Sequence, residues 1–225
     1  MRIMAVAFDY DRTLTDESLE ISEKTVAAVK RLRNAGIKTI VVSGRVLEFL
    51  DGVNAKFQIA DAIVAENGAV VCFPKTGGKT VLGKENSGRI KKAFGRQQGF
   101  FVREAIVATT VEHLEKARAV LDENGLSGIS DIELNRRDVM IMPKGVNKEK
   151  GLAEALRMMG IRRESAACIG DGENDLSLFR ACGYRVAVAN AVGVLKERAD
   201  FICSKPYGEG VAEFIVRLCQ EYGRQ

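Results

Sequence analysis

The sequence of 225 residues contains no tryptophan and one histidine, His113. Hydrolases of the Ser-His-Asp or Cys-His type need a histidine base, and many zinc sites use histidine ligands. His113 lies in a stretch that is typical of an exposed helix. These chemistries are therefore nearly excluded.

Long apolar runs, paired cysteines and a strong net charge are also absent. No segment approaches the length of a membrane span, and the N-terminal apolar run is shorter than a signal-peptide core. The five cysteines are odd in number and widely spaced, which predicts reduced core thiols. With 34 basic and 30 acidic residues, the net charge of +4 favours small anions but is too weak to indicate nucleic acid. We expect a cytoplasmic monomer or homodimer with no nucleic-acid or membrane partner.

The first informative stretch is an apolar run, Ile3 to Phe8, that stops at Asp9 and Asp11. Such a run is typical of a buried strand of a parallel sheet, and ligands of such sheets bind where strands end. If the chain stays extended across Tyr10, both carboxylates face the same side and repel each other unless a cation or a shared proton compensates. A divalent metal is the simplest solution, and the alternative is an Asp-rich turn.

Short apolar runs alternate with helical patterns through most of the chain. The order strand, helix, strand, helix, strand runs to Ala65, and alternation resumes at Lys148 and continues to Glu221. This order predicts an α/β fold with a parallel, doubly wound sheet. Between about Val81 and Met142 the order of elements changes, which indicates a small α+β insertion. The predicted domains are a core of residues 1–80 and 143–225 and an insertion of residues 81–142.

A second predicted strand, Ala166–Ile169, also ends in acidic residues. Asp171, Glu173 and Asp175 follow it within a glycine-containing turn. Acids at this place would repel a pyrophosphate, so the glycines do not indicate a dinucleotide site. Hard cations take oxygen ligands, and two acidic strand ends in one sheet supply them, with Mg²⁺ the best match.

Taken together, these features resemble the haloacid dehalogenase superfamily of phosphatases. Asp9-Tyr10-Asp11-Arg12-Thr13 is similar to the nucleophile motif of that family, and Ser43 matches the hydroxyl of its second motif. Lys148 matches the lysine of the third motif, and Gly170 to Asp175 match the acidic fourth motif. Four motifs in order, spread over the whole chain outside the insertion, are a specific signal. The family implies a Rossmann-like core with an inserted cap.

The resemblance also implies a role for each matched residue. Asp9 would attack phosphorus and Asp11 would act as general acid and base. Mg²⁺ would be held by Asp9, the backbone carbonyl of Asp11 and Asp171, with Asp175 binding directly or through water. Phosphate would be bound by Ser43, Gly44, Lys148 and Asn174, while Glu173 would be a solvated bystander.

Two short segments narrow the resemblance. Asn67-Gly68-Ala69 and Ala189-Asn190-Ala191 are similar to the Cof-type branch, whose cap is inserted before the lysine. The small cap and the turn that begins at Glu66 are most similar to archaeal-type phosphoglycolate phosphatases and their sucrose-phosphate phosphatase relatives. The implied activity is Mg²⁺-dependent hydrolysis of a small phosphorylated metabolite. Phosphoglycolate is the first candidate substrate, and a sugar phosphate is the alternative.

Rival interpretations remain from other functional classes. A signalling receiver module also uses an aspartate, a hydroxyl and a lysine around Mg²⁺, but its chain is about half as long and has no cap. A degenerate binding protein would have lost some of the acids and the lysine.

Two arginine features add further expectations. Arg12 stands where the family frequently has glycine, which affects the geometry of the loop or the access of substrate. Arg136 and Arg137 lie between two predicted cap strands, where they either clamp a substrate carboxylate or occupy an exposed turn.

Overall fold

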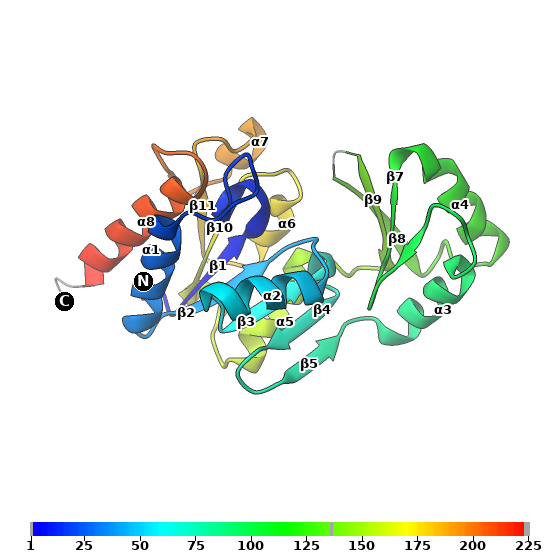
Figure 1. Ribbon diagram of the computed structural model, residues 1–225, viewed down its shortest axis with the longest axis horizontal. Helices are drawn as coiled ribbons and strands as arrows, with labels where there is room; N and C mark the ends of the chain where they lie inside the picture. The colour runs from blue at the N-terminus through cyan, green and yellow to red at the C-terminus, as the bar shows by residue number, and fades with distance from the viewer. Residues whose placement is uncertain (1, 136, 223–225) are drawn as a thin grey trace.

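The computed structural model describes residues 2–135 and 137–222 and shows two domains joined side by side (Figure 1). The larger domain contains an eight-stranded sheet, and the smaller one contains a four-stranded sheet. The larger sheet has the order β12-β11-β10-β1-β2-β3-β4-β5, and the smaller has the order β6-β7-β9-β8.

The central strand of the larger sheet is β1, Ala5–Asp9, and all of its residues are buried. It pairs in parallel with β2 (Lys38–Val42) on one side and with β10 (Ala166–Gly170) on the other. Outside these lie β3 (Ala62–Ala65) and, on the far side, β11 (Tyr184–Ala187) and β12 (Phe201–Ile202). The strand order reverses between β1 and β10, so this is the switch point where open α/β sheets bind ligands.

The sheet is not parallel throughout. Beyond β3, the strands β4 (Val70–Phe73) and β5 (Gly78–Val81) form an antiparallel hairpin at the edge. The strands from β12 to β3 are parallel, as predicted. These two strands are joined by a tight turn and need no crossover helix, because they are antiparallel. The strand β5 forms the edge of the larger sheet.

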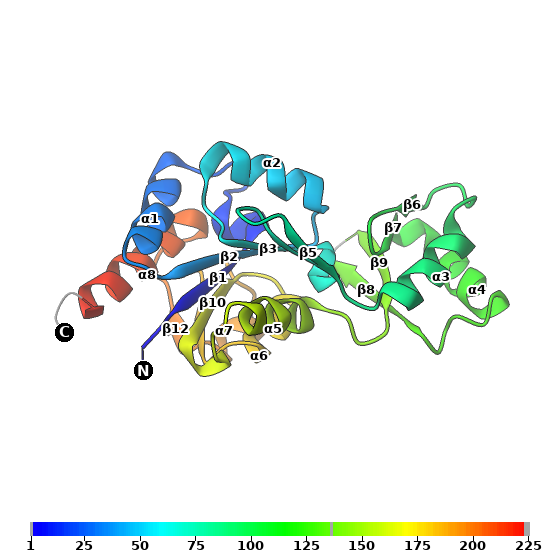
Figure 2. The same cartoon turned by 90° about the horizontal axis from the view of Figure 1, so that it is seen from below.

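Helices cover both faces of the larger sheet. Figure 2 shows α2 on one face and α5 and α6 on the other. The helix α1 packs along α8, and Ser22 begins α1 by accepting a hydrogen bond of 3.1 Å from the backbone N–H of Thr25. The helices are α1 (Glu23–Asn34), α2 (Leu47–Phe57), α5 (Lys148–Met158), α6 (Asp175–Arg180), α7 (Gly193–Lys196) and α8 (Tyr207–Tyr222). Short helical turns occupy Tyr10–Leu14, Glu66–Gly68 and Arg163–Ser165.

The smaller domain, called the cap below, has its own core. Its antiparallel strands are β6 (Phe101–Val102), β7 (Val107–Thr110), β8 (Ser130–Asn135) and β9 (Asp138–Pro143). A tight turn at 103–106 separates β6 from β7. Its helices are α3 (Lys84–Phe94) and α4 (Leu114–Glu123), with a helical turn at Val111–His113 before α4.

Alternation along β9 shows which face of the cap is turned to the larger domain. Ile141 belongs to the cap's own apolar core, whereas Met140 and Met142 belong to the core of the larger domain. Successive side chains of a strand point to opposite faces, so one face of the cap sheet carries its helices and the other lies over the larger domain. The last strand before the cap, β5, ends at Val81, and the last strand of the cap, β9, ends at Pro143. Each of these ends lies one residue from the boundary predicted for an insertion of residues 81–142.

The described residues include no helix with both the length and the apolar character needed to cross a bilayer. Of the five cysteines, Cys72, Cys168, Cys182 and Cys203 are buried and none of the five forms a disulfide within the described chain.

Candidate active site

A cavity of about 530 Å³ lies between the two domains at the carboxyl ends of β1, β2 and β10. The larger domain contributes most of the charged groups of the lining, and the cap closes the opposite side with residues of β7, β8, β9 and the turn before β7. The lining includes Asp9, Asp11, Arg12, Gly44, Arg45, Lys148, Asp171 and Asn174 from the larger domain and Arg103, Ile106, Thr109, Asn135, Asp138 and Met140 from the cap.

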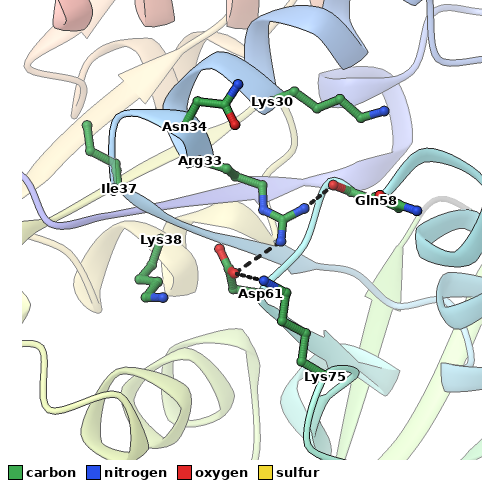
Figure 3. Close-up of a pocket in the computed structure, with 9 residues that line it drawn as sticks. Lys30, Arg33, Asn34, Ile37, Lys38, Gln58, Asp61 and Lys75 are labelled. Carbon is green, nitrogen blue, oxygen red and sulfur yellow. Dashed lines mark hydrogen bonds and ion pairs between the residues drawn. The ribbon is translucent and has the colours of Figure 1, made fainter.

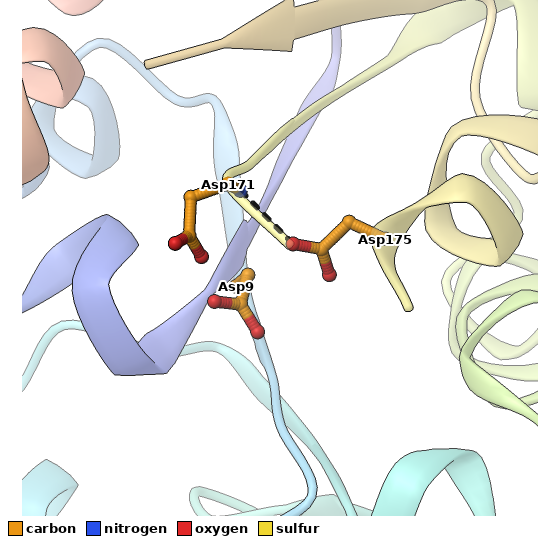
Figure 4. A group of neighbouring side chains, drawn as sticks. All are labelled: Asp9, Asp171 and Asp175. Carbon is orange, nitrogen blue, oxygen red and sulfur yellow. Dashed lines mark hydrogen bonds between the residues drawn. The ribbon is translucent and has the colours of Figure 1, made fainter. Parts of the chain in front are cut away.

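Three carboxylates converge at the floor of this cavity (Figure 4). Asp9 is the last residue of β1, Asp171 follows β10, and Asp175 begins α6; each has an oxygen within 4.8 Å of the others. The second oxygen of Asp175 accepts hydrogen bonds of 3.0 Å from the backbone N–H groups of Asp171 and Gly172. A Cβ atom on Gly170 would lie 2.5 Å from that same oxygen, so glycine is required for the close approach.

Lys148, the first residue of α5, partly neutralises the carboxylates. Its Nζ donates hydrogen bonds of 2.7 Å to Asp9 Oδ1 and to Asp175 Oδ1, and its side chain is only 1% exposed. Burial by itself lowers the pKa of Lys148, but the carboxylates of Asp175 and Asp9 outweigh it and raise that pKa above its usual value. The ammonium group therefore stays charged in the interior.

The charge of the cluster indicates what else the site holds. Burial, followed by the negative charges of Asp175 and Asp171, raises the pKa of Asp9 well above its usual value, although Lys148 opposes the shift. One lysine cannot compensate three carboxylates, and the two remaining negative charges would be balanced by a divalent cation. The three residues of the cluster offer carboxylate oxygens as metal ligands, which suits a hard metal ion. Asp9 and Asp171 would hold it, with Asp175 binding directly or through water because its oxygens already accept three hydrogen bonds.

The carboxylate of Asp11 is not part of this three-acid cluster. A tight turn starts at Tyr10, so the chain does not remain extended, which was the condition for placing both carboxylates on one side by strand alternation. Asp9 and Asp11 nevertheless line the same cavity. The carboxylate of Asp11 instead pairs with Arg45, at 2.7 Å from Nη2 and 3.1 Å from Nε. These hydrogen bonds raise the pKa of Arg45. The predicted contact of the Asp11 carbonyl with a metal stays a prediction, as does the role of Asp11 as general acid and base.

Comparisons with known proteins agree with this geometry. The model of the haloacid dehalogenase-like hydrolases matches residues 6–94 and 83–215. The chain belongs to this family. It is 33% identical over 220 residues to the phosphoglycolate phosphatase of Methanothermobacter thermautotrophicus, covering 95% of this chain and 98% of the relative.

Solved structures of other proteins share the fold. A Thermoplasma acidophilum protein aligns with a TM-score of 0.81 at 20% identity, covering 97% of this chain and 99% of that one. The sugar phosphatase BT4131 of subclass IIB aligns with a TM-score of 0.72 at 21% identity, covering 95% and 98%. The expected Rossmann-like core with a small inserted cap is confirmed, as is the assignment to the hydrolases of this superfamily.

In this haloacid dehalogenase-like chain, the turn that follows β1 is held by groups that received no role from the sequence. Thr13 donates a hydrogen bond of 3.3 Å to Asp171, and the side-chain amide of Asn190 donates one of 2.9 Å to the carbonyl of Arg12. The oxygen of Asn190 accepts the backbone N–H of Tyr207 at 2.7 Å. Asn190 lies just beyond the end of a strand, as the acids do. This position in the sequence could have indicated that Asn190 belongs to the site.

The other predicted residues occupy distinct places. Gly44 and Asn174 line the cavity, and Glu173 is exposed, as expected of a bystander. Ser43 is buried beneath the lining, where its hydroxyl accepts the N–H of Arg45 at 3.1 Å and lies 3.5 Å from Asp11. Phosphate binding by Ser43, Gly44, Lys148 and Asn174 stays a prediction.

The structure does not support a carboxylate clamp by Arg137, one of the two arginines considered for that role. Arg137 forms an ion pair with Glu112, and its side chain is 81% exposed. Of the two expectations for Arg137, this agrees with the exposed turn. Arg136 lies outside the described residues. Arg103, in the turn between β6 and β7, is the cap arginine that lines the cavity, and the sequence analysis missed it.

A second pocket, of about 410 Å³, lies at the opposite end of β2 (Figure 3). Arg33 at the end of α1 bridges to the carbonyl of Gln58 and, at 3.2 Å, to Asp61. Asp61 also accepts the backbone N–H of Thr39 at 3.1 Å. Burial opposes these contacts, yet the hydrogen bonds from Thr39 and Arg33 hold the pKa of Asp61 below its usual value. The contacts in this pocket therefore connect α1 with β2 and with the segment before β3.

Glu66 connects the cap to the larger domain. Its side chain is buried, and its carboxylate accepts three backbone hydrogen bonds from the cap turn, from Glu104 (3.0 Å), Ala105 (2.8 Å) and Ile106 (3.2 Å). Its own N–H bonds to the carbonyl of Arg45 at 3.0 Å. The turn that carries Arg103 is thus fastened next to the loop that carries Arg45.

Replacing Glu66 with alanine is expected to destabilise the protein by about 2–4 kcal/mol, because three backbone donors, two of them buried, lose a charged acceptor. Urea denaturation measures the change. Glu173→Ala is the matched control, since that acid is exposed, and it should change stability by less than about 0.5 kcal/mol. If both variants match the wild type, Glu66 does not fasten the cap.

Proposed function

We propose that this haloacid dehalogenase-like hydrolase is a Mg²⁺-dependent phosphatase that hydrolyses a small phosphomonoester through an aspartyl-phosphate. The observation that carries the proposal is the buried Asp9 at the switch point, hydrogen-bonded to Lys148 and adjacent to Asp171 and Asp175. A carboxylate is a competent nucleophile towards phosphorus, and a buried ammonium group offsets the charge of the phosphoryl oxygens.

The reaction divides into two displacements. In the first, an oxygen of Asp9 bonds to phosphorus while the ester P–O bond breaks, and the leaving oxygen takes a proton from the carboxyl group of Asp11. In the second, Asp11 as a carboxylate takes a proton from water, which attacks phosphorus and releases Asp9. Arg45 orients Asp11 through a two-nitrogen contact. A bound Mg²⁺ would supply charge stabilisation for the phosphoryl oxygens.

Phosphoglycolate is the substrate that we propose first. Relatives about as long as this chain carry the name phosphoglycolate phosphatase, and the cavity is small and lined by four basic side chains. A sugar phosphate is the second candidate, because a sugar phosphatase shares the fold. A receiver module is disfavoured by the cap and by a phosphoacceptor on the first strand, and a degenerate protein by the intact acids and lysine.

A substrate panel tests the proposal. We expect kcat/KM for phosphoglycolate to exceed the values for hexose phosphates by at least about tenfold, because cationic groups favour a substrate with a second charge. Phosphate release from the purified enzyme is measured for each ester. A clear preference for a hexose phosphate would move the assignment to the second candidate.

Metal removal tests the cofactor. Excess EDTA is expected to reduce hydrolysis of an aryl phosphate by at least about a hundredfold, and Mg²⁺ should restore it, since the carboxylate cluster needs a cation to accept a phosphate anion. Thermal unfolding with and without Mg²⁺ gives an independent readout of binding. Undiminished turnover in EDTA after dialysis would contradict a metal role.

A further inference from the structure

The basic side chains that line the active-site cavity differ in what they contact. Lys148 pairs with Asp9 and Asp175, and Arg45 pairs with Asp11. The guanidinium of Arg103 lies over the ring of Phe101, with 5.5 Å to the ring centre. Among the described residues, Arg12 is the lining cation whose side chain has no ion pair, hydrogen bond or ring contact.

The backbone of Arg12 is in an unfavourable conformation for arginine. Its φ of 62° and ψ of 9° lie in the left-handed region, which glycine adopts freely and residues with a Cβ avoid. Hydrogen bonds hold the residue there: its N–H donates to Thr15 Oγ1 at 2.8 Å, and its carbonyl accepts from Asn190 at 2.9 Å. A costly residue at a place suited to glycine points to a use for its side chain.

We propose that Arg12 is the residue that binds the carboxylate of the leaving group. Arg12 directly follows Asp11, the residue proposed to protonate the leaving oxygen, and both residues line the same cavity. A guanidinium forms two parallel hydrogen bonds with a carboxylate, which an aryl or sugar leaving group does not offer. This inference rests on the proposed phosphatase function and names the chemical group that its substrate carries.

An acid that also lines the cavity is the competing partner. Glu17 could be thought to neutralise Arg12, but the carboxylate of Glu17 accepts a hydrogen bond of 2.6 Å from the hydroxyl of Tyr207. No ion pair between Glu17 and Arg12 occurs in the described structure. The guanidinium therefore remains available to a ligand.

The test compares Arg12→Gly with the wild type on phosphoglycolate and on an aryl phosphate without a carboxylate. We expect kcat/KM for phosphoglycolate to fall about 10- to 100-fold, mainly through KM, since a charge-assisted contact is lost. The value for the aryl phosphate should change less than about threefold. The unfolding temperature should stay equal or rise, because glycine adopts this backbone without strain. Arg12→Lys should fall between the two, since it keeps the charge but loses the fork.

Leu19→Gly is the matched control. Leu19 lies on the wall of the same cavity and also has a positive φ, 63°, but it carries no charge. Its replacement should leave the ratio of the two substrates unchanged. Equal effects of Arg12→Gly on both substrates, or no effect on either, would reject the role of Arg12 alone. A wild-type enzyme that hydrolyses the aryl ester but not phosphoglycolate would reject the proposed substrate together with the role of Arg12.

Discussion

Replacing Asp9 with asparagine is expected to lower turnover by about four orders of magnitude or more. An amide oxygen is a poor nucleophile towards phosphorus, and residues that form the covalent intermediate carry effects of this size. Asp9 is buried at the end of the central strand, at the switch point of the sheet. Phosphate release and trapping of the phosphoenzyme measure the loss, and both should disappear together.

The same replacement is expected to leave the fold as stable as before, or more stable. Burial and two neighbouring acids raise the pKa of Asp9, so the folded state binds its proton more tightly than the unfolded chain does. The contribution of Asp9 to stability therefore falls as the pH rises through the window between its unfolded and folded pKa values. Asparagine does not ionise, so it removes this pH-dependent loss of stability, and it leaves Lys148 paired with Asp175. A variant with near-normal turnover would show that Asp9 is not the nucleophile, whatever its stability.

Replacing Lys148 with methionine is expected both to abolish activity and to destabilise the protein by about 3–5 kcal/mol, the cost of leaving buried charges without their partner. Asp9 and Asp175 would then lie close together, with no positive charge in hydrogen-bond contact with either. Mg²⁺ should recover part of the lost stability, because a divalent cation also neutralises the carboxylates.

Urea denaturation with and without Mg²⁺ measures this effect. Lys150→Met is the control: it removes a lysine from the same turn of α5, but Lys150 is exposed, so the change should stay below about 0.5 kcal/mol. If Lys148→Met is as stable as Lys150→Met without metal, the buried pair contributes little, and the charge argument for a divalent cation loses its support.

The sequence alone determined the elements and the end of the sheet at which the site lies. The apolar run before Asp9 and the acids after Ile169 predicted two buried strands, and the structure pairs these strands as β1 and β10. The reason is local: uninterrupted apolar runs with turn residues behind them are compatible with few structures other than buried strands. The parallel order of the strands follows from the alternation with helices, so the switch point was also determined by the sequence.

The tertiary structure alone decided which partners the candidate catalytic groups have. Asp9 and Asp11 are two residues apart, yet the turn at Tyr10 sends one to Lys148 and the other to Arg45. Glu66 reaches residues of the cap turn about forty positions away, and such contacts leave no periodic signal in the chain. Arg12 and Arg137 show the same limit, because both are arginines beside an aspartate in the sequence. Only the folded backbone brings Arg12 into the cavity and leaves Arg137 exposed.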